Sequence, residues 1–216
     1  PATGEMKIGT VGPILEGFEV KIAEDGEILC KGPGVMKGYY KAPEMTAEVM
    51  DENGWFHTGD IGVLEDAKYL KITDRKKEIF KLSGGKYIAP QMIENKLKTS
   101  NLIEQVMVIG ANEKFASALI SPNFSLLHDW CAEHKIHFKN NEELIKIPAV
   151  VEKIRKEVDI VNKTLGTHEK ISRIRLVCEE WTPANGELSP TLKLRRNTVS
   201  VKYQHLIDDI YSVGKS

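Results

Sequence analysis

The chain has 216 residues, of which 41% are hydrophobic and 28% are charged, and its formal net charge is -1. This composition is typical of a globular protein of one or two domains. The nearly balanced charge argues against a general nucleic-acid-binding protein. No apolar run in the sequence approaches the ~20 residues that a membrane-spanning helix requires.

Two features of the sequence bear on its compartment. The cysteines, Cys30, Cys131 and Cys178, are sparse and odd in number, so they predict reduced cytosolic thiols rather than a disulfide framework. The chain begins at Pro1 with no signal-peptide pattern. We expect it to be the later part of a longer protein, so its targeting stays open.

The first part of the chain, up to about residue 73, is predicted to be rich in β-strands. Residues 18–22 alternate apolar and polar side chains, as a half-buried strand does. The turn signal Asp25-Gly26 leads into a second strand at residues 27–31, so the two strands are expected to form a hairpin. A helix opened by a proline is expected over residues 43–50, and a further strand over residues 69–72.

After Asp74 the pattern changes to mixed α and β, and we place a domain boundary there. Strands are expected over residues 106–110, 116–121 and 172–178. Helices are expected from Pro90 onward, over 123–134, over 150–165 and over 198–211. The predicted fold class is therefore α+β.

Three segments carry residue types suited to chemistry. The first is Phe56-His57-Thr58-Gly59-Asp60, the second covers residues 74–86 and the third covers residues 186–196. Carboxylates at turns bind sugar hydroxyls, Arg and Lys bind phosphate, and glycine lets a backbone approach a ligand closely. Together the segments predict a nucleotide site where two parts of the chain meet.

In this order and with these gaps, the three segments resemble the adenylate-forming enzymes, and most of all the long-chain fatty acid–CoA ligases. The resemblance implies that residues 1–73 are the C-terminal β-subdomain of a large adenylating domain. Residues 74–216 would form the small mixed α/β lid domain, with the hinge at Asp74. The family's phosphate-binding loop belongs upstream and does not occur here, so the chain resembles the C-terminal portion of a longer enzyme.

The resemblance assigns nucleotide binding to two residues. Asp60 would accept hydrogen bonds from the ribose hydroxyls, and Arg75 would contact the ribose or phosphate of the adenylate. The residues alone leave other interpretations open: Thr58-Gly59-Asp60 is also ordinary turn chemistry, and Asp74-Arg75 is also a surface ion pair. Aspartate tolerates unusual backbone angles, which suits the hinge role assigned to Asp74.

A glycine-rich basic loop is assigned by the resemblance to the thioester-forming step with coenzyme A. Its residues are Lys81, Ser83, Gly84, Gly85 and Lys86. The glycines would leave room for a thin pantetheine arm, and Lys86 would lie near a CoA phosphate. The alternative is a plain hairpin loop with solvated lysines.

The resemblance makes Lys193 the catalytic residue for adenylation. Attack of a carboxylate on the α-phosphate brings two anions together, and an ammonium on a flexible stem suits that task. The commonest family form has Gly before this lysine, whereas this chain has Leu192. We interpret the neighbouring Arg195 and Arg196 as a solvated basic cluster.

No metal site is predicted. Cys131, His134 and His137 are spaced so that they could share one helix face, but a fourth ligand is not evident.

The resemblance implies ATP-dependent activation of a long-chain fatty acid as acyl-adenylate, followed by transfer to coenzyme A. ATP, Mg²⁺ and CoA would be required, and the partners would be the fatty acid and the missing N-terminal part of the same chain, with no nucleic acid. We expect a cytoplasmic location, with peripheral membrane contact through the substrate left open. Two alternatives remain: an adenylation module that loads a carrier protein, and a non-catalytic module that binds a nucleotide or partner.

Overall fold

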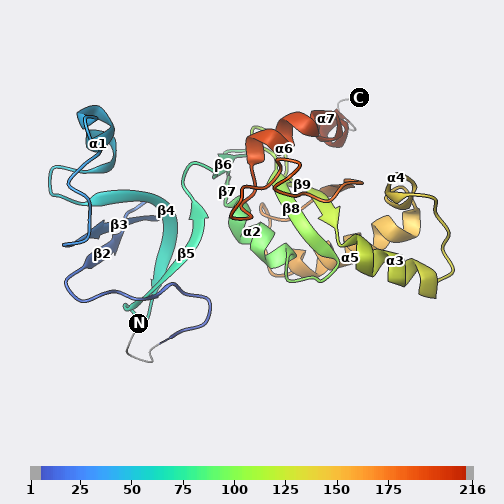
Figure 1. Ribbon diagram of the computed structural model, residues 1–216, viewed down its shortest axis with the longest axis horizontal. Coiled ribbons are helices and arrows are strands. Elements are labelled where there is room, and N and C mark those ends of the chain that lie inside the picture. The colour runs from blue at the N-terminus through green and yellow to red at the C-terminus, as the bar shows by residue number, and fades with distance from the viewer. Residues whose placement is uncertain (1–5, 213–216) are drawn as a thin grey trace. The chain divides into compact units, whose positions relative to one another are not determined.

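The computed structural model of the protein describes residues 6–212 (Figure 1). The chain divides into two compact units, residues 1–79 and residues 80–216. Sheets and helices in the two units confirm the predicted α+β class. The hinge residue named from the sequence, Asp74, lies in a strand a few residues before this division, and its hinge role stays a prediction. Within residues 6–212 we find no helix with the length and apolar character needed to cross a membrane.

The first unit is built on an antiparallel sheet with the strand order β1-β5-β4-β3-β2. The elements are β1 (Gly12–Pro13), β2 (Glu19–Ile22), β3 (Glu27–Lys31), α1 (Pro43–Val49), β4 (Phe56–Glu65) and β5 (Tyr69–Arg75). The expected hairpin is confirmed, since β2 pairs with β3 in antiparallel register around a turn in which Gly26 has a φ of 84°. The expected helix is confirmed too, with its proline in the first turn.

A bulge interrupts the longest strand of this unit, β4. Glu27 pairs with Ile61 and Leu29 pairs with His57, so Thr58-Gly59-Asp60 lies opposite the single residue Ile28. Gly59 has a φ of 72°, in the left-handed region that favours glycine. Thr58-Gly59-Asp60 is therefore a bulge within a continuous strand, and it keeps local turn chemistry, since the Asp60 N–H donates to Thr58 Oγ1 at 3.1 Å. Bulges of this kind often re-aim a side chain beside a functional site.

The second unit contains a three-stranded sheet with the order β10-β9-β8 and a separate hairpin of β6 and β7. Its strands are β6 (Phe80–Lys81), β7 (Tyr87–Ile88), β8 (Ile103–Ile109), β9 (Ser117–Pro122) and β10 (Arg173–Leu176). Its helices are α2 (Pro90–Leu97), α3 (Phe124–Glu133), α4 (Asn141–Leu144), α5 (Pro148–Asn162), α6 (Arg196–Lys202) and α7 (Gln204–Ser212). Strand β9 runs antiparallel to β8 and parallel to β10.

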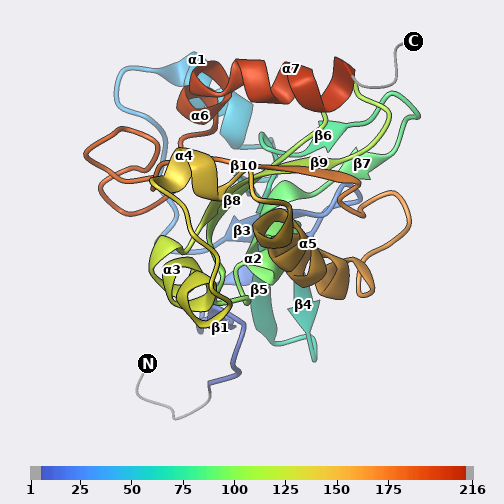
Figure 2. The same ribbon diagram turned by 90° about the vertical axis from the view of Figure 1, so that its right-hand side faces the viewer.

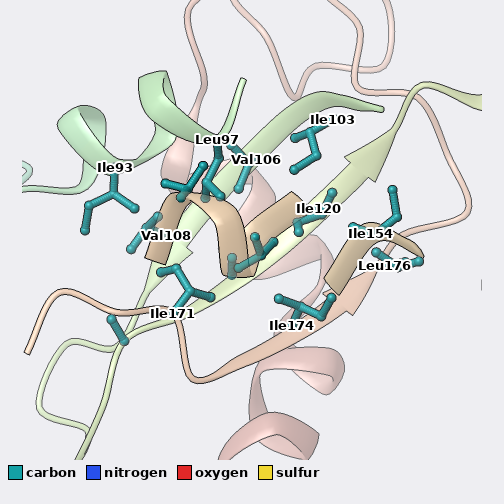
Figure 3. Close-up of a cluster of buried hydrophobic side chains, with 14 of the residues drawn as sticks. Ile93, Leu97, Ile103, Val106, Val108, Ile120, Ile154, Ile171, Ile174 and Leu176 are labelled. Atoms are coloured by element: carbon teal, nitrogen blue, oxygen red, sulfur yellow. The ribbon is translucent and has the colours of Figure 1, made fainter. Parts of the chain in front are cut away.

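Both faces of the β10-β9-β8 sheet are covered, because successive side chains of a strand point to opposite faces. Val106, Val108 and Ile120 belong to the larger core, together with side chains of α2 and α5 (Figure 3). Helix α3 contributes to the same core. Met107 and Leu119 belong to a second core, formed with α6 and α7. Figure 2 shows α6 and α7 on one side of the strands and α2, α3 and α5 on the other. Burial on both faces explains the nearly continuous apolar runs of β8 and β9.

The predicted helices before α6 are confirmed, but the last one is wrong. Helix α3 is capped by Asn123, whose side chain accepts a hydrogen bond of 3.2 Å from the backbone N–H of Leu126. The single helix expected over residues 198–211 is instead two helices, α6 and α7, which are separated at Tyr203. Tyr203 has a φ of -110° and is buried against Trp181, with 6.0 Å between the ring centroids. We attribute the break to this packing.

Candidate functional site

The structure brings the two predicted nucleotide-binding residues together at the edge of the β4 bulge. Asp60 and Arg75 are cross-strand partners on β4 and β5, and the Arg75 Nε lies 2.7 Å from Asp60 Oδ1. The Asp60 side chain is mostly buried, whereas the Arg75 side chain is 49% exposed. The pair therefore presents a positioned carboxylate beside an accessible guanidinium, a combination suited to a ribose and a phosphate.

A buried carboxylate that the sequence did not reveal, Glu27, supports this bulge from behind. Its Oε1 accepts a hydrogen bond of 2.9 Å from the Gly59 N–H, and its Oε2 lies 2.8 Å from Lys76 Nζ and 3.0 Å from His57 Nδ1. Burial raises the pKa of the Glu27 carboxyl, but hydrogen bonds with Lys76, His57 and Gly59 outweigh burial and leave the pKa below its ordinary value. The ionised form of Glu27 thus holds the backbone just before Asp60.

The predicted hinge residue, Asp74, is fully buried within β5. It pairs with Ile61 of β4, and its Oδ1 accepts a hydrogen bond of 2.7 Å from the Arg75 backbone N–H. Its carboxylate therefore fixes the residue that pairs with Asp60.

The glycine-rich loop forms the turn between β6 and β7, and Lys81, Ser83, Gly84, Gly85 and Lys86 are all exposed. The Leu82 N–H donates to the Lys86 carbonyl at 2.8 Å, and the Ser83 N–H donates to the Glu113 carbonyl at 2.9 Å. A side chain added at Gly84 would meet no atom within 4 Å. Gly84 is therefore not needed for internal packing, and the space above it is open to a ligand.

Lys193 is exposed on a short hairpin between β10 and α6. Leu188 and Leu194 form an antiparallel bridge, and the Ser189 N–H donates to the Lys193 carbonyl at 2.8 Å. The Lys193 N–H in turn donates to Ser189 Oγ at 3.0 Å. The backbone of Lys193 is therefore held by hydrogen bonds while its side chain faces solvent.

The structure shows the backbone conformation of Leu192, the position at which the commonest family form has glycine. Leu192 has a φ of 60°, in the left-handed region, and its side chain is exposed. It is the last residue of a three-residue loop of the kind that ends in a left-handed residue. Glycine adopts this conformation without strain, so the geometry accounts for a preference for glycine at this position.

The interpretation of Arg195 and Arg196 as one solvated basic cluster is wrong for Arg196. Its Nη2 lies 2.6 Å from Glu94 Oε2, and both side chains are mostly buried. Arg195 is exposed as expected. The difference arises because Arg196 begins α6 and faces α2, a contact between residues that are 102 positions apart in the sequence.

A second buried carboxylate, Glu187, precedes the Lys193 hairpin. Its Oε1 lies 2.7 Å from Lys202 Nζ, and Lys202 also forms an ion pair with Glu179. Burial raises the pKa of the Glu187 carboxyl, but the hydrogen bond with Lys202 and backbone hydrogen bonds hold it below its ordinary value. Glu187 lies within the third motif segment, but the sequence did not reveal its burial, because its partner Lys202 lies on the following helix.

The cysteine–histidine trio considered from the sequence stays without an assigned role. Cys131 is buried, and the Nδ1 of His134 lies 2.8 Å from the Trp130 carbonyl oxygen. Within residues 6–212, no group of three or more His, Cys, Asp or Glu side chains is placed to hold a metal ion.

The family to which the chain belongs follows from comparison with known proteins. The profile of a family described as the AMP-binding enzyme C-terminal domain matches residues 77–215. The chain belongs to this family. The match includes the glycine-rich loop and the Lys193 hairpin, and it confirms the resemblance to adenylate-forming enzymes.

Relatives of this AMP-binding C-terminal domain are fatty acid–CoA ligases. The chain is 35% identical over 209 residues to the long-chain-fatty-acid–CoA ligase FadD15 of Mycobacterium tuberculosis, covering 96% of this chain and 35% of that protein. It is 40% identical over 195 residues to long-chain-fatty-acid–CoA ligase 1 of Homo sapiens, covering 88% and 28% respectively. The chain thus spans only 35% and 28% of the lengths of these two curated relatives.

A solved structure supports the fold of this AMP-binding C-terminal domain. The adenylation domain of a carboxylate reductase from Mycobacterium chelonae aligns with a TM-score of 0.72 at 24% identity. The alignment covers 93% of this chain and 31% of that chain. The arrangement of strands and helices described above is therefore that of an adenylating enzyme.

Proposed function

We propose that the enzyme containing this chain activates a long-chain fatty acid with ATP and transfers it to coenzyme A. The observation that carries the proposal is the exposed Lys193 on an ordered hairpin, within a chain that belongs to the AMP-binding C-terminal domain family. The names of its relatives, long-chain-fatty-acid–CoA ligases, support the choice of substrate.

In the first half-reaction, a carboxylate oxygen of the fatty acid attacks the α-phosphorus of ATP, and pyrophosphate leaves. Lys193 would lie between the two anions and offset their repulsion as the new bond forms. Asp60 would accept hydrogen bonds from the ribose hydroxyls while Arg75, 2.7 Å away, orients its carboxylate and contacts the nucleotide. Mg²⁺ would accompany ATP and shield the phosphates, and we assign it no ligand from this chain.

In the second half-reaction, the CoA thiol attacks the acyl carbonyl carbon, and AMP leaves. The open space above Gly84 would admit the pantetheine arm. Lys81, Ser83, Gly85 and Lys86 would line the same loop. Figure 2 shows the β6–β7 hairpin and the long loop between β10 and α6 at opposite edges of the second unit. Rotation about a hinge at Asp74 would therefore exchange one edge for the other at a shared site.

The location proposed for the enzyme is cytoplasmic, with membrane contact only through the fatty acid that it binds. Transfer of an acyl chain from water into a bilayer is favourable by ~0.8 kcal/mol of free energy for each methylene group, so long-chain substrates gather at the membrane. The substrate itself would therefore bring the enzyme to the membrane surface.

The test uses the full-length enzyme with ATP, Mg²⁺, CoA and fatty acids of graded chain length. Formation of AMP and acyl-CoA, with the highest kcat/KM for long chains, is the expected result. Acyl transfer only to a phosphopantetheine-bearing carrier protein would favour a carrier-loading module instead, and absence of both products would reject the proposal. Residues 1–216 alone should fold but form no acyl-CoA.

A further inference from the structure

Two buried carboxylates at the base of the Lys193 hairpin have no part in the chemistry described above. Glu94 is 6% exposed and Glu187 is 0% exposed. Burying a charge is costly unless it is paired and hydrogen-bonded, so such groups need a reason to be present. Glu94 pairs with Arg196, three residues after Lys193, and Glu187 lies in the segment before Lys193 and pairs with Lys202 of α6.

Glu187 fixes the strand that leads into the hairpin. Its carboxylate pairs with Lys202 at 2.7 Å and accepts a hydrogen bond of 3.3 Å from the Thr182 N–H. Its backbone carbonyl accepts a hydrogen bond of 2.8 Å from the Arg195 N–H, across the hairpin. One residue thus connects both strands of the hairpin to α6.

Glu94 fixes the chain that leaves the hairpin. The Nη2 of Arg196 lies 2.7 and 2.6 Å from the two carboxylate oxygens of Glu94, and its Nη1 donates to the Val108 carbonyl at 3.3 Å. The Val108 N–H donates to Glu94 Oε1 at 2.7 Å. Arg196, three residues after Lys193, is therefore held on α2 and β8 of the main core.

We propose that Glu94 and Glu187 are positioning residues that fix the backbone of Lys193 for adenylation, an inference that rests on the proposed function. An electrostatic catalyst works when its charge is already in place as the transition state forms. A lysine side chain is flexible, so the hairpin backbone is what limits where the ammonium can reach. Fixing both ends of the hairpin restricts that backbone, whereas the β6–β7 loop that serves thioester formation has its own separate supports.

The experiment measures both half-reactions of the full-length enzyme on the same preparation, for Glu94→Gln and Glu187→Gln. Adenylation is followed as fatty-acid-dependent pyrophosphate release, and thioester formation as acyl-CoA produced from supplied acyl-adenylate. The ratio of the two rates does not depend on the fraction of folded enzyme. We expect adenylation to fall about 10–100-fold, since a ~1 Å misplacement of a catalytic group costs ~10² in rate. Thioester formation should stay within about twofold.

Two comparisons make the result decisive. Arg195→Gln changes an exposed neighbour between Lys193 and Arg196, and it should leave the ratio unchanged. Lys193→Ala tests the proposed function itself: if it does not lower adenylation selectively, the proposed role of Lys193 fails. If Lys193→Ala lowers adenylation selectively but both carboxylate variants keep the wild-type ratio, Glu94 and Glu187 are only structural and this inference is overturned.

A second pair of variants covers a failure to fold. Arg196→Lys keeps the charge but replaces the planar guanidinium, whose two Nη atoms contact Glu94 and Val108, with a single ammonium, and Lys202→Met removes the partner of Glu187. Each should lower the ratio of the adenylation rate to the thioester-forming rate, as the carboxylate variants do. The decrease should be smaller for Arg196→Lys than for Glu94→Gln. An unchanged ratio in both folded variants overturns the proposal.

Discussion

The two exposed turns of the second unit are supported in different ways. The β6–β7 loop rests on backbone hydrogen bonds and on the buried side chains of Leu82 and Ile88. The Lys193 hairpin rests on ion pairs that involve buried carboxylates, Glu94 with Arg196 and Glu187 with Lys202. In the proposed function the β6–β7 loop only leaves space for a ligand, which requires a fixed backbone. The Lys193 hairpin places a charge there, which requires that both of its ends be held. A substitution in one turn should therefore impair one half-reaction and leave the other nearly unchanged.

The largest expected effect comes from Lys193→Ala in the full-length enzyme. Adenylation should fall by ~10²–10³, the usual cost of losing one well-placed charge contact in a transition state. Thioester formation from supplied acyl-adenylate should be nearly unchanged, because the proposed function assigns that step to the β6–β7 loop. Lys193→Arg, which keeps a positive charge, should lose less. Equal losses in both half-reactions would mean that the hairpin and the loop do not act separately.

Gly84→Leu should have the opposite effect on the two half-reactions in the full-length enzyme. A Cβ added at Gly84 meets no atom within 4 Å and the residue is exposed, so we expect the melting temperature to change little. The side chain would occupy the space proposed for the pantetheine arm, and thioester formation should fall by about 10–100-fold while adenylation persists. In Gly84→Ala, which adds only a methyl group, the rate of thioester formation should fall less. A normal rate of CoA transfer in a folded Gly84→Leu enzyme would remove the CoA assignment of this loop.

The supports of both sites show what the sequence could and could not reveal. Local signals correctly indicated the β2–β3 hairpin and the helices opened by Pro90 and Asn123, because turns and caps depend on neighbouring residues. The role of Glu27 was not predictable, since its partners His57 and Lys76 are 30 and 49 positions away. Propensity and periodicity report on local structure, and they do not specify which distant segments pair.

Chemistry-bearing residues were easier to find than the residues that hold them. Asp60 and Arg75 were selected because they stand in motifs, and the structure places them 2.7 Å apart. Glu187 stands in a motif segment too, but nothing in the sequence marked it as a buried side chain paired with Lys202. A supporting carboxylate looks like any surface acid until the partner that neutralises it is known.

The contacts by which Glu27 supports the β4 bulge can be tested by measuring stability as a function of pH. The pKa of Glu27 is lowered in the folded state, so its stabilising effect is present above its unfolded pKa and is lost as pH falls through the folded value. Glu27→Gln should lower the free energy of unfolding at pH 7 by about 1–3 kcal/mol, through loss of charged hydrogen bonds. Its melting temperature should then fall less than that of the wild type between pH 6 and pH 3, which is roughly the range of acidic titration.

The control for this titration is Asp66→Asn. Asp66 pairs with Lys7 at 2.7 Å, but its side chain is 71% exposed, so the pair contributes little and the acid response should match the wild type. Parallel acid melting curves for Glu27→Gln and the wild type would show that the pKa of Glu27 is the same in the folded and unfolded states. The ion-pair support drawn for the β4 bulge would then be wrong.

The smallest effect concerns the conformation of the hairpin rather than its charge, and Leu192→Gly tests it. Leucine at a φ of 60° costs roughly 1–2 kcal/mol in backbone strain, which glycine relieves. Glycine also gains more freedom in the unfolded chain, at a cost of about 0.5–1 kcal/mol, and little burial is lost because Leu192 is 65% exposed. The net result should be a stabilisation of roughly 0–1 kcal/mol by denaturant melting, with adenylation unchanged. Thr191→Gly serves as the matched control, since Thr191 has no left-handed strain to relieve and should be destabilised. If Leu192→Gly instead lowers adenylation selectively, the stiffness of leucine at this turn helps to place Lys193, and the ion pairs at the base of the hairpin do not fix it alone.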